Sequence, residues 1–313
     1  MIINNTEILP GQNEKIEVNI ARLPSHSTID IGINVARAKK PGPVLLLVGG
    51  MHGDEINGIE IVRRIIENGW NIPTRGTIIS IPIINIYGFI HFSRYVPDGK
   101  DVNRSFPGNK NGSLASRVAY YLMKDILPQI DLGLDFHTGG ADRTNYPQIR
   151  CNMNSEENEQ LAAIFNAPFT IHSMYRPKSL RYSANKLGKK ILVFEGGESA
   201  RFDEFAIREG MNGALRIMRH LKMTPYKAPK AKHTNQIIKH SSWVRAHTSG
   251  IFLSNVKSGE QVRKNQIMGF ISDPFDEFKI PVKAPASGFV IGLNHNPILH
   301  QGDAIMHIGV VKS

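Results

Sequence analysis

Two histidines and a glutamate stand where the chain turns out of buried strands, and their types suit hydrolytic metal chemistry. His52 and Glu55 follow the apolar run Val44–Val48 and the turn Gly49–Met51, and His137 closes a second apolar run before a glycine pair. A helix beginning at His52 would place His52 and Glu55 on one face, because they are three residues apart. Two imidazoles and one carboxylate are a ligand set of zinc hydrolases, which leave the fourth position open for water. The pattern predicts a metal centre at the carboxyl ends of strands, where open α/β sheets place their ligands.

A His-x-x-Glu pattern alone is short, and unrelated polar residues in a tight turn also produce it. Further polar residues favour a site. Asn103 and Arg104 lie in the segment Asp98–Gly108, where an amide beside a guanidinium can hold a carboxylate in bidentate fashion. Glu195 closes the apolar run that begins at Leu192, and it is placed to act as a general base.

The order of these motifs resembles a known family. Gly-x-His-Gly-x-Glu comes first, followed by Asp-x-Asn-Arg, a strand-end histidine and a strand ending in Glu-Gly, over about residues 44–200. This arrangement is similar to the succinylglutamate desuccinylase/aspartoacylase group of the zinc carboxypeptidase superfamily. The resemblance implies that His52, Glu55 and His137 bind one zinc ion per chain and that Glu195 is the catalytic carboxylate.

The resemblance also implies which residues bind the substrate. Asn103 and Arg104 would bind a substrate carboxylate. An arginine upstream of this pair polarises the scissile carbonyl in the family, and Arg94 is the nearest match, although its spacing is loose. Arg143 and Arg181 are only candidates for the arginines that select the acyl group.

The predicted reaction follows from the charge of the ligand set. Two neutral imidazoles and one carboxylate leave zinc with about one positive charge, which lowers the pKa of its water to about 7. We expect a zinc-dependent amidohydrolase that hydrolyses the amide bond of an N-acyl amino acid. A carboxypeptidase or a deacylase acting on peptides stays open as an alternative. So does a non-catalytic binding protein, although such a protein has no need of a base at Glu195.

The excess of basic residues raises the question whether the binding partner is a nucleic acid or a small acidic molecule. The chain has 38 basic and 27 acidic residues among 313, a formal net charge of +11. The basic residues are scattered, with no aromatic-interleaved stripe and no recognition motif for nucleic acid. We therefore expect a small carboxylate-bearing substrate rather than nucleic acid.

The lack of a recognisable targeting signal and the single cysteine predict an intracellular protein. The sequence contains no run of 18 apolar residues and no basic-then-apolar start, so we expect a cytoplasmic protein without a membrane partner. The single cysteine, Cys151, excludes an internal disulfide and fits a reducing compartment. A homo-oligomer is left open.

Strand and helix patterns alternate through most of the chain. Alternating runs at 15–20 and 28–35 predict half-buried strands, and 77–84 predicts a strand whose Pro82 argues for an edge or a bulge. Helical patterns follow at 55–67, 113–127, 155–166, 180–187 and 203–221. This order predicts an α/β fold with a mixed, largely parallel sheet and helices on both faces, as in zinc carboxypeptidases.

The composition changes after Leu221. The segment Lys222–Lys232 has two prolines and four lysines and is interpreted as a linker between a catalytic domain at 1–232 and a C-terminal all-β module at 233–313. The module resembles biotinyl/lipoyl-like half-barrels. However, Lys279 lies between Phe278 and Ile280 rather than in the usual Met-Lys-Met, so we expect no covalent modification there.

Overall fold

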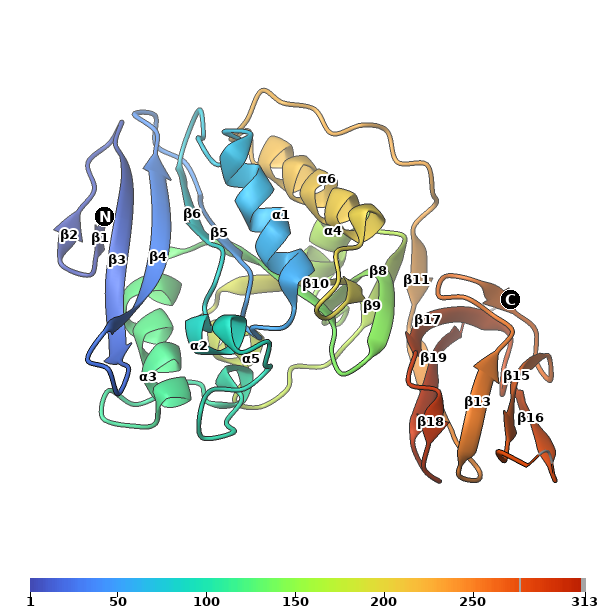
Figure 1. Cartoon of the computed structure of the whole chain (residues 1–313). Coiled ribbons are helices and arrows are strands. Elements are labelled where there is room, and N and C mark those ends of the chain that lie inside the picture. The colour runs from blue at the N-terminus through green and yellow to red at the C-terminus, as the bar shows by residue number, and fades with distance from the viewer. Residues whose placement is uncertain (276, 311–313) are drawn as a thin grey trace.

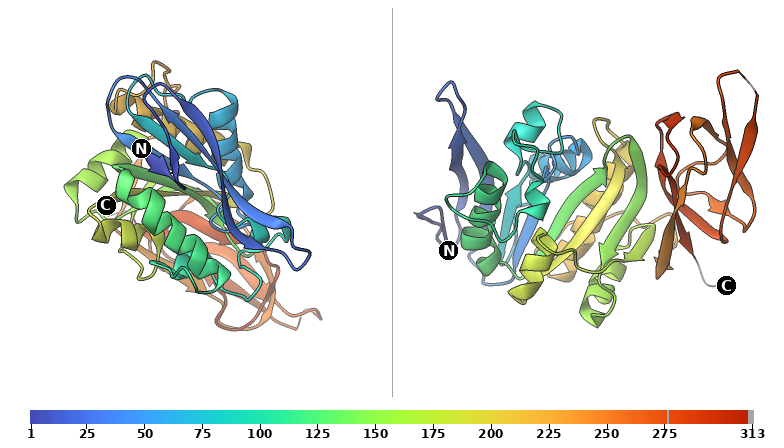
Figure 2. Two further views of the ribbon diagram at one scale, coloured as in Figure 1. Left: turned by 90° about the vertical axis from the view of Figure 1, so that its left-hand side faces the viewer. Right: turned by 90° about the horizontal axis from the view of Figure 1, so that it is seen from below.

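The computed structural model describes residues 1–275 and 277–310. It shows a large mixed sheet covered by helices and continued by a C-terminal part made of strands (Figures 1 and 2). This architecture confirms the predicted α/β class. No helix in the described part of the chain is long and apolar enough to cross a membrane.

Four parallel strands form the centre of the sheet, in the order β6-β5-β7-β10. Their bounds are Val44–Val48 for β5, Thr77–Ile81 for β6, Leu132–Gly139 for β7 and Lys190–Glu198 for β10. Helices cover these strands on both sides, which is why β5 is a continuous apolar run rather than an alternating one. Because the strands are parallel, the chain leaves β5, β7 and β10 at the same edge of the sheet.

Antiparallel strands flank this centre. On one side lie β4 (Thr28–Arg37) and β3 (Asn13–Arg22), whose buried and exposed residues alternate as predicted. On the other side β8 (Arg143–Cys151) runs antiparallel to β10. Two further strands, β9 (Phe169–His172) and β11 (Gln236–Ile238), extend the sheet beside β8. The short β1 (Ile2–Ile3) and β2 (Thr6–Glu7) form a separate pair.

Helices cover both faces of the sheet, and each face has its own apolar core (Figure 1). Leu45 and Leu47 of β5 pack against one layer, made of α1 (Ile56–Glu67), α4 (Glu156–Phe165) and α6 (Glu204–His220). Leu46 and Val48 pack into the other core, which includes α3 (Leu114–Tyr121), α5 (Leu180–Lys186) and the first residue of α2 (Ile86–Ile90). Successive residues of β5 therefore face opposite layers, as strand geometry requires.

Side-chain caps explain where three of the predicted helices begin. The side chains of Ser155, Ser179 and Asp203 accept hydrogen bonds from backbone amides in the first turns of α4, α5 and α6. The predicted helix at 113–127 is less regular. After α3 the chain makes a π-helical turn, η2 (Leu122–Ile126), and a 3-10 turn, η3 (Leu127–Gln129), before strand β7.

The predicted strand at 77–84 was wrong in its end and in its place in the sheet. Strand β6 ends at Ile81, and it is internal because β4 and β5 pair with its two sides. Pro82 lies just after it and so breaks no ladder hydrogen bond, which removes the reason to expect an edge strand. The segment predicted as a linker, Lys222–Lys232, contains no helix or strand, and its Met223 is buried in the core that residues of α6 also form.

The C-terminal part consists of strands in the described residues, as predicted. They are β12 (His240–Arg245), β13 (Gly250–Ser254), β14 (Gln261–Val262), β15 (Ile267–Ser272), β16 (Lys279–Lys283), β17 (Gly288–Asn294), β18 (Ile298–Leu299) and β19 (Ala304–Val310). These strands enclose a core of their own. Strand β17 also pairs antiparallel with β8, and β19 and β12 follow it, so the main sheet continues into this part.

Candidate active site

The first two predicted ligands lie in a turn rather than in a helix. Helix α1 begins at Ile56, with Glu55 at its N-cap position. The expectation that His52 and Glu55 share a helix face was therefore wrong. A turn brings them together instead, with the Glu55 amide donating to the His52 carbonyl at 3.3 Å. Gly53 is required inside this turn because a Cβ there would lie 1.9 Å from the carbonyl carbon of Gly88 in α2.

His52, Glu55 and His137 form one buried cluster. Glu55 Oε1 lies 2.6 Å from Nδ1 of His52, and Glu55 Oε2 lies 2.8 Å from Nδ1 of His137. The three side chains offer one ligand atom each, and these atoms all lie within 4.8 Å of one another. The backbone amide of Thr138 also donates to Glu55 Oε2 at 3.1 Å. The cluster joins the turn after β5 to strand β7, at the carboxyl ends of both strands.

The outer nitrogen of each imidazole faces a carboxylate. Nε2 of His52 lies 3.2 Å from Oδ1 of Asp101, and Nε2 of His137 lies 2.9 Å from Oδ2 of Asp135. The second pair has the distance of an ion pair but not the alignment of a hydrogen bond. Asp135 precedes His137 by two residues on β7, which explains why both lie on one face of the sheet. A carboxylate behind a ligand histidine orients its ring and raises its basicity.

Burial and neighbouring charges have opposite effects on the pKa values of His52 and Glu55. Burial favours the neutral forms, but the charge of Glu55 and hydrogen bonds to Asp101 and Glu55 raise the pKa of His52 overall. Burial likewise opposes the carboxylate at Glu55, yet His52 and His137 hold its pKa well below the usual range. Glu55 is therefore the anion of the cluster at neutral pH, which suits a metal ligand.

Arg94 lies beside this cluster, on the loop that follows α2. Its Nη1 atom lies 3.1 Å from Oε1 of Glu55, and its Nη2 atom donates to Oδ2 of Asp101 at 2.9 Å. Burial lowers the pKa of Arg94, but the charges of Glu55, Asp101 and Glu195 outweigh this effect and raise it. The guanidinium therefore lies within electrostatic reach of both Glu55 and Glu195.

Glu195 is held by two residues of β8. Oε2 of Glu195 accepts a hydrogen bond of 2.6 Å from Nδ2 of Asn145, and Oε1 lies 3.3 Å from Nη1 of Arg150. On its other side Glu195 is the register partner of His137 in β7. Glu195 therefore lies on the strand next to His137 and at the same level of the sheet. Its side chain is 16% exposed.

A β-bulge explains how Asn145 reaches Glu195. Glu195 pairs with Gln148 and Gly197 pairs with Asn145, so β10 advances by two residues while β8 advances by three. The extra residue of β8 places Asn145 on the same face as Gln148, which regular alternation would not do. Pro147 lies within this bulge, one of the few places where a strand tolerates proline.

Asn103 and Arg104 lie in a short 3-10 turn, η1 (Val102–Arg104), that Asp101 caps. Oδ1 of Asn103 accepts a hydrogen bond of 2.9 Å from the amide of Leu180, which ties the turn to the start of α5. Among the residues described, no carboxylate lies within ion-pair distance of Arg104, whose guanidinium is half-buried. Burial, together with the charges of Arg176 and Arg94, lowers the pKa of Arg104 despite Asp101. A substrate carboxylate beside Arg104 would stabilise the charged form of its guanidinium.

The two candidate acyl-selecting arginines differ in their surroundings. Arg181 is buried and bonded to the carbonyls of Arg150 and Met174, so it stabilises the protein itself. Arg143 lies at the start of β8, 5.7 Å above the ring of Trp243 in β12. The Trp243 ring in turn stacks on His307 of β19 at 4.6 Å. The C-terminal strands therefore contribute side chains near β8.

Sequence reasoning missed three residues that contact the predicted ones. Asp101 is the first residue of the Asp-x-Asn-Arg motif, and its spacing from Asn103 suits a cap, which is the signal that could have identified it. Asn145 and Arg150 gave no signal, because their contact with Glu195 depends on the antiparallel pairing of β8 with β10 and on the bulge. Neither feature is readable from a local pattern.

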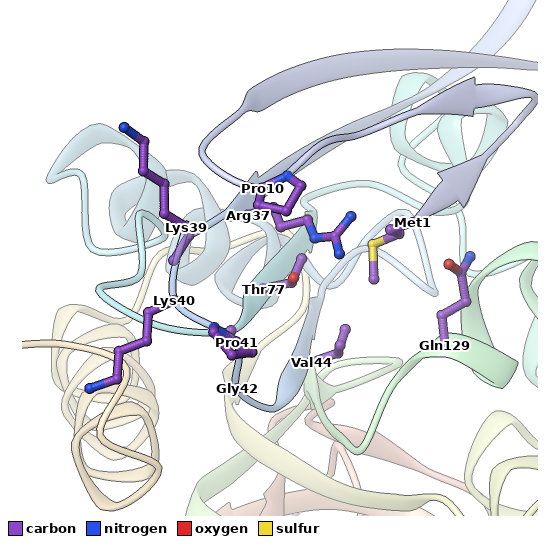
Figure 3. A pocket seen from close by; sticks show the side chains of 12 residues that line it. Met1, Pro10, Arg37, Lys39, Lys40, Pro41, Gly42, Val44, Thr77 and Gln129 are labelled. Atoms are coloured by element: carbon purple, nitrogen blue, oxygen red, sulfur yellow. The ribbon is translucent and has the colours of Figure 1, made fainter.

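A hollow of about 530 Å³ lies elsewhere, at the opposite edge of the sheet (Figure 3). Arg37, Lys39 and Lys40 line it, together with the first residues of β5 and β6. It contains none of the predicted site residues. The strands place their chemistry at their carboxyl ends, as open α/β sheets do.

Comparison with known proteins identifies the family. Residues 41–221 match the model of the succinylglutamate desuccinylase/aspartoacylase catalytic domain. The N-alpha-acetyl-L-2,4-diaminobutyric acid deacetylase of Halomonas elongata is 26% identical over 284 residues, covering 86% of this chain and 83% of the relative.

Solved structures share the fold. The succinylglutamate desuccinylase/aspartoacylase of Rhodobacter sphaeroides is similar with a TM-score of 0.84 at 24% identity, covering 96% of both chains. The product-bound ectoine utilization protein EutE (DoeB) of Ruegeria pomeroyi also gives a TM-score of 0.84, at 21% identity and 97% coverage of both chains. The chain belongs to the succinylglutamate desuccinylase/aspartoacylase family, whose members include amide-hydrolysing deacylases.

Proposed function

We propose that this protein is a zinc-dependent amidohydrolase that removes the acyl group from an N-acyl amino acid. The observation that carries the proposal is the arrangement of the two histidines. Each turns one ring nitrogen toward Glu55 and the other toward a second carboxylate, that of the partly buried Asp101 or of the buried Asp135. This is the pattern of metal-binding histidines with their supporting carboxylates.

His52, Glu55 and His137 fit a zinc ion through their donor types and their closeness. Two imidazoles and a carboxylate form one of the known three-ligand sets of catalytic zinc, and one such set implies one ion per chain. A bound zinc ion supplies a Lewis acid and lowers the pKa of a water molecule to about 7. Asp101 and Asp135 would keep the two rings oriented when the metal binds.

Glu195 is proposed as the general base and acid. It would take a proton from the attacking water and return it to the leaving amine, the usual double duty of such a carboxylate. Asn145 and Arg150 hold one oxygen each, so the carboxylate has a defined orientation. This role is supported by the pairing of Glu195 with His137, a proposed zinc ligand, across the parallel strands β10 and β7.

Arg94 and Arg104 are proposed to act on different parts of the substrate. Arg94 already contacts Glu55, and its guanidinium would stabilise the negative charge that develops on the carbonyl oxygen. Arg104 would bind a carboxylate of the substrate, with Asn103 beside it, and so fix the distance between that group and the scissile bond. The substrate is thus a small molecule that bears a carboxylate.

A hydrolysis panel tests this proposal. The name of the Halomonas relative makes N-acetylated amino acids the first substrates to assay, followed by N-succinyl and other N-acyl amino acids. Short peptides and peptides with an acylated residue form the second arm. Release of free amino acid from the first group by the zinc-loaded protein, and not from peptides, is the expected result. Cleavage of peptides alone would assign a carboxypeptidase or a peptide deacylase instead.

A further inference from the structure

Asn145 of β8 lies between Glu195 and a glycine of the C-terminal strands. It pairs with Gly197 of β10 on one side and with Gly292 of β17 on the other. Gly292 in turn pairs with His307 of β19. One row of paired residues therefore runs from the strand of the proposed catalytic carboxylate into the C-terminal part of the chain.

The amide of Asn145 has a defined orientation. A carboxylate accepts hydrogen bonds and does not donate them, so the NH₂ group of Asn145 must face Glu195, at 2.6 Å. The carbonyl oxygen Oδ1 then points toward Gly292. A Cβ atom added at Gly292 would lie 2.9 Å from this oxygen, closer than real contacts of that kind.

Space, rather than backbone conformation, requires glycine at position 292. The backbone of Gly292 does not occupy the left-handed region that favours glycine. The next neighbours of a Cβ there are Cβ of His307 at 3.4 Å and the carbonyl oxygen of Thr144 at 3.5 Å, which are ordinary contacts. The Asn145 amide is thus the group that a methyl at this position would displace.

We propose that Asn145 is a positioning residue for Glu195 and that Gly292 keeps the Asn145 amide in place. The C-terminal strand β17 therefore takes part in orienting the proposed catalytic carboxylate. This inference rests on the proposed function only in naming Glu195 as the base. The contact itself, between Asn145 and Glu195, does not depend on the metal or on the substrate.

The effect of a substitution at Gly292 should be selective. Oδ1 of Asn145 is the end of a flexible side chain, so the amide can rotate away while the strands stay paired. In the described part of the chain, His52, Glu55 and His137 make their hydrogen bonds and ion pairs with residues other than Asn145 and Gly292. Loss of orientation at Glu195 should therefore reduce turnover and leave metal binding unchanged.

Gly292→Ala is the direct test, assayed on an N-acyl amino acid that the wild type hydrolyses. We expect kcat to fall about tenfold to a hundredfold, because small misplacements of a catalytic group have effects of that size. KM, zinc content and thermal unfolding should stay near the wild-type values. The control is Gly32→Ala in β4, where a Cβ would meet nothing within 4 Å, and it should leave all four quantities unchanged.

A double-mutant cycle separates positioning from a general structural effect. Asn145→Ala removes both the contact to Glu195 and the oxygen that Gly292→Ala would meet, so it should lower kcat by a similar factor. Gly292→Ala added to this variant should change kcat by less than about twofold, since both substitutions act through one group. Independent losses that multiply would overturn the proposal. If Gly292→Ala fails to fold, the double variant should fold, and its failure would also overturn the proposal.

A crystal structure of Gly292→Ala gives a readout that does not need activity. The Nδ2 atom of Asn145 should lie beyond hydrogen-bond distance from Glu195, and an unchanged contact would refute the role of Gly292. A wild type that hydrolyses no N-acyl amino acid would refute the proposed function, while this structural result would still decide whether Gly292 holds Asn145.

Discussion

Asp101 lies 3.2 Å from Nε2 of His52 through one carboxylate oxygen, and through the other it holds Arg94 at 2.9 Å. One side chain thus fixes both a proposed metal ligand and the proposed carbonyl-polarising arginine. The same Asp101 caps the turn that carries Asn103 and Arg104. The loop around Asp101 therefore links a proposed metal ligand to the residues proposed to bind the substrate.

Replacement of Asp101 by asparagine should weaken zinc binding. Asparagine keeps the shape but removes the charge that orients His52, and such partners typically contribute 10–100-fold to metal affinity or activity. A zinc competition titration measures the change. Asp98→Asn is the matched control, because Asp98 lies on the same loop but pairs with the exposed Lys100. Equal affinities for the two variants would show that Asp101 does not support the metal centre.

Arg104→Lys should impair substrate binding more than turnover. Lysine keeps the positive charge but loses the planar fork that matches a carboxylate. We expect KM for a carboxylate-bearing substrate to rise while kcat changes little, as measured by steady-state kinetics. Arg208→Lys, on the exposed face of α6, serves as a control. Unchanged kinetics for both Arg104→Lys and Arg104→Ala would make Asn103 and Arg104 structural.

Glu60 should contribute to acid sensitivity. Hydrogen bonds from Arg63 and Arg64 lower the pKa of Glu60 to about 2, although burial of the carboxyl opposes this shift. A carboxyl whose pKa is lower in the folded state stabilises the protein above its unfolded pKa, near 4.3, and loses this contribution as the pH falls toward 2. The free energy of unfolding, measured in urea at pH 6 and pH 3, should therefore drop less in Glu60→Gln than in the wild type. The same pH dependence in both proteins would contradict this assignment.

Removal of residues 233–313 should impair folding although the proposed metal ligands lie upstream. The truncation would take away β11 and β17, and so expose the edges of β9 and β8. We expect a lower unfolding temperature or aggregation of the truncated chain. A truncated chain that unfolds at the wild-type temperature would support an independent catalytic domain at 1–232.

Intact-mass analysis of the full chain should show no biotinyl or lipoyl adduct on Lys279.

Local patterns predicted most of the elements and the closeness of His52, Glu55 and His137. Val44–Val48 was predicted without error because a strand covered on both sides must be apolar throughout. The start of α1 was misjudged since a turn also brings His52 near Glu55. The partners of Glu195 could not be predicted, because Asn145 and Arg150 reach it through pairing between distant segments and an extra residue in β8.

Glu195→Gln tests the central claim most directly. The wild type and this variant are treated with zinc in the same way, their zinc occupancy is measured, and kcat is compared on an N-acyl amino acid. Glutamine is nearly the same shape but cannot accept and return a proton. General acid–base catalysis typically contributes 10²–10⁴-fold, so kcat should fall by about that factor while zinc occupancy and KM stay close to wild type. Loss of zinc would make Glu195 a ligand, and a near-normal kcat would leave the proposed hydrolysis without its base.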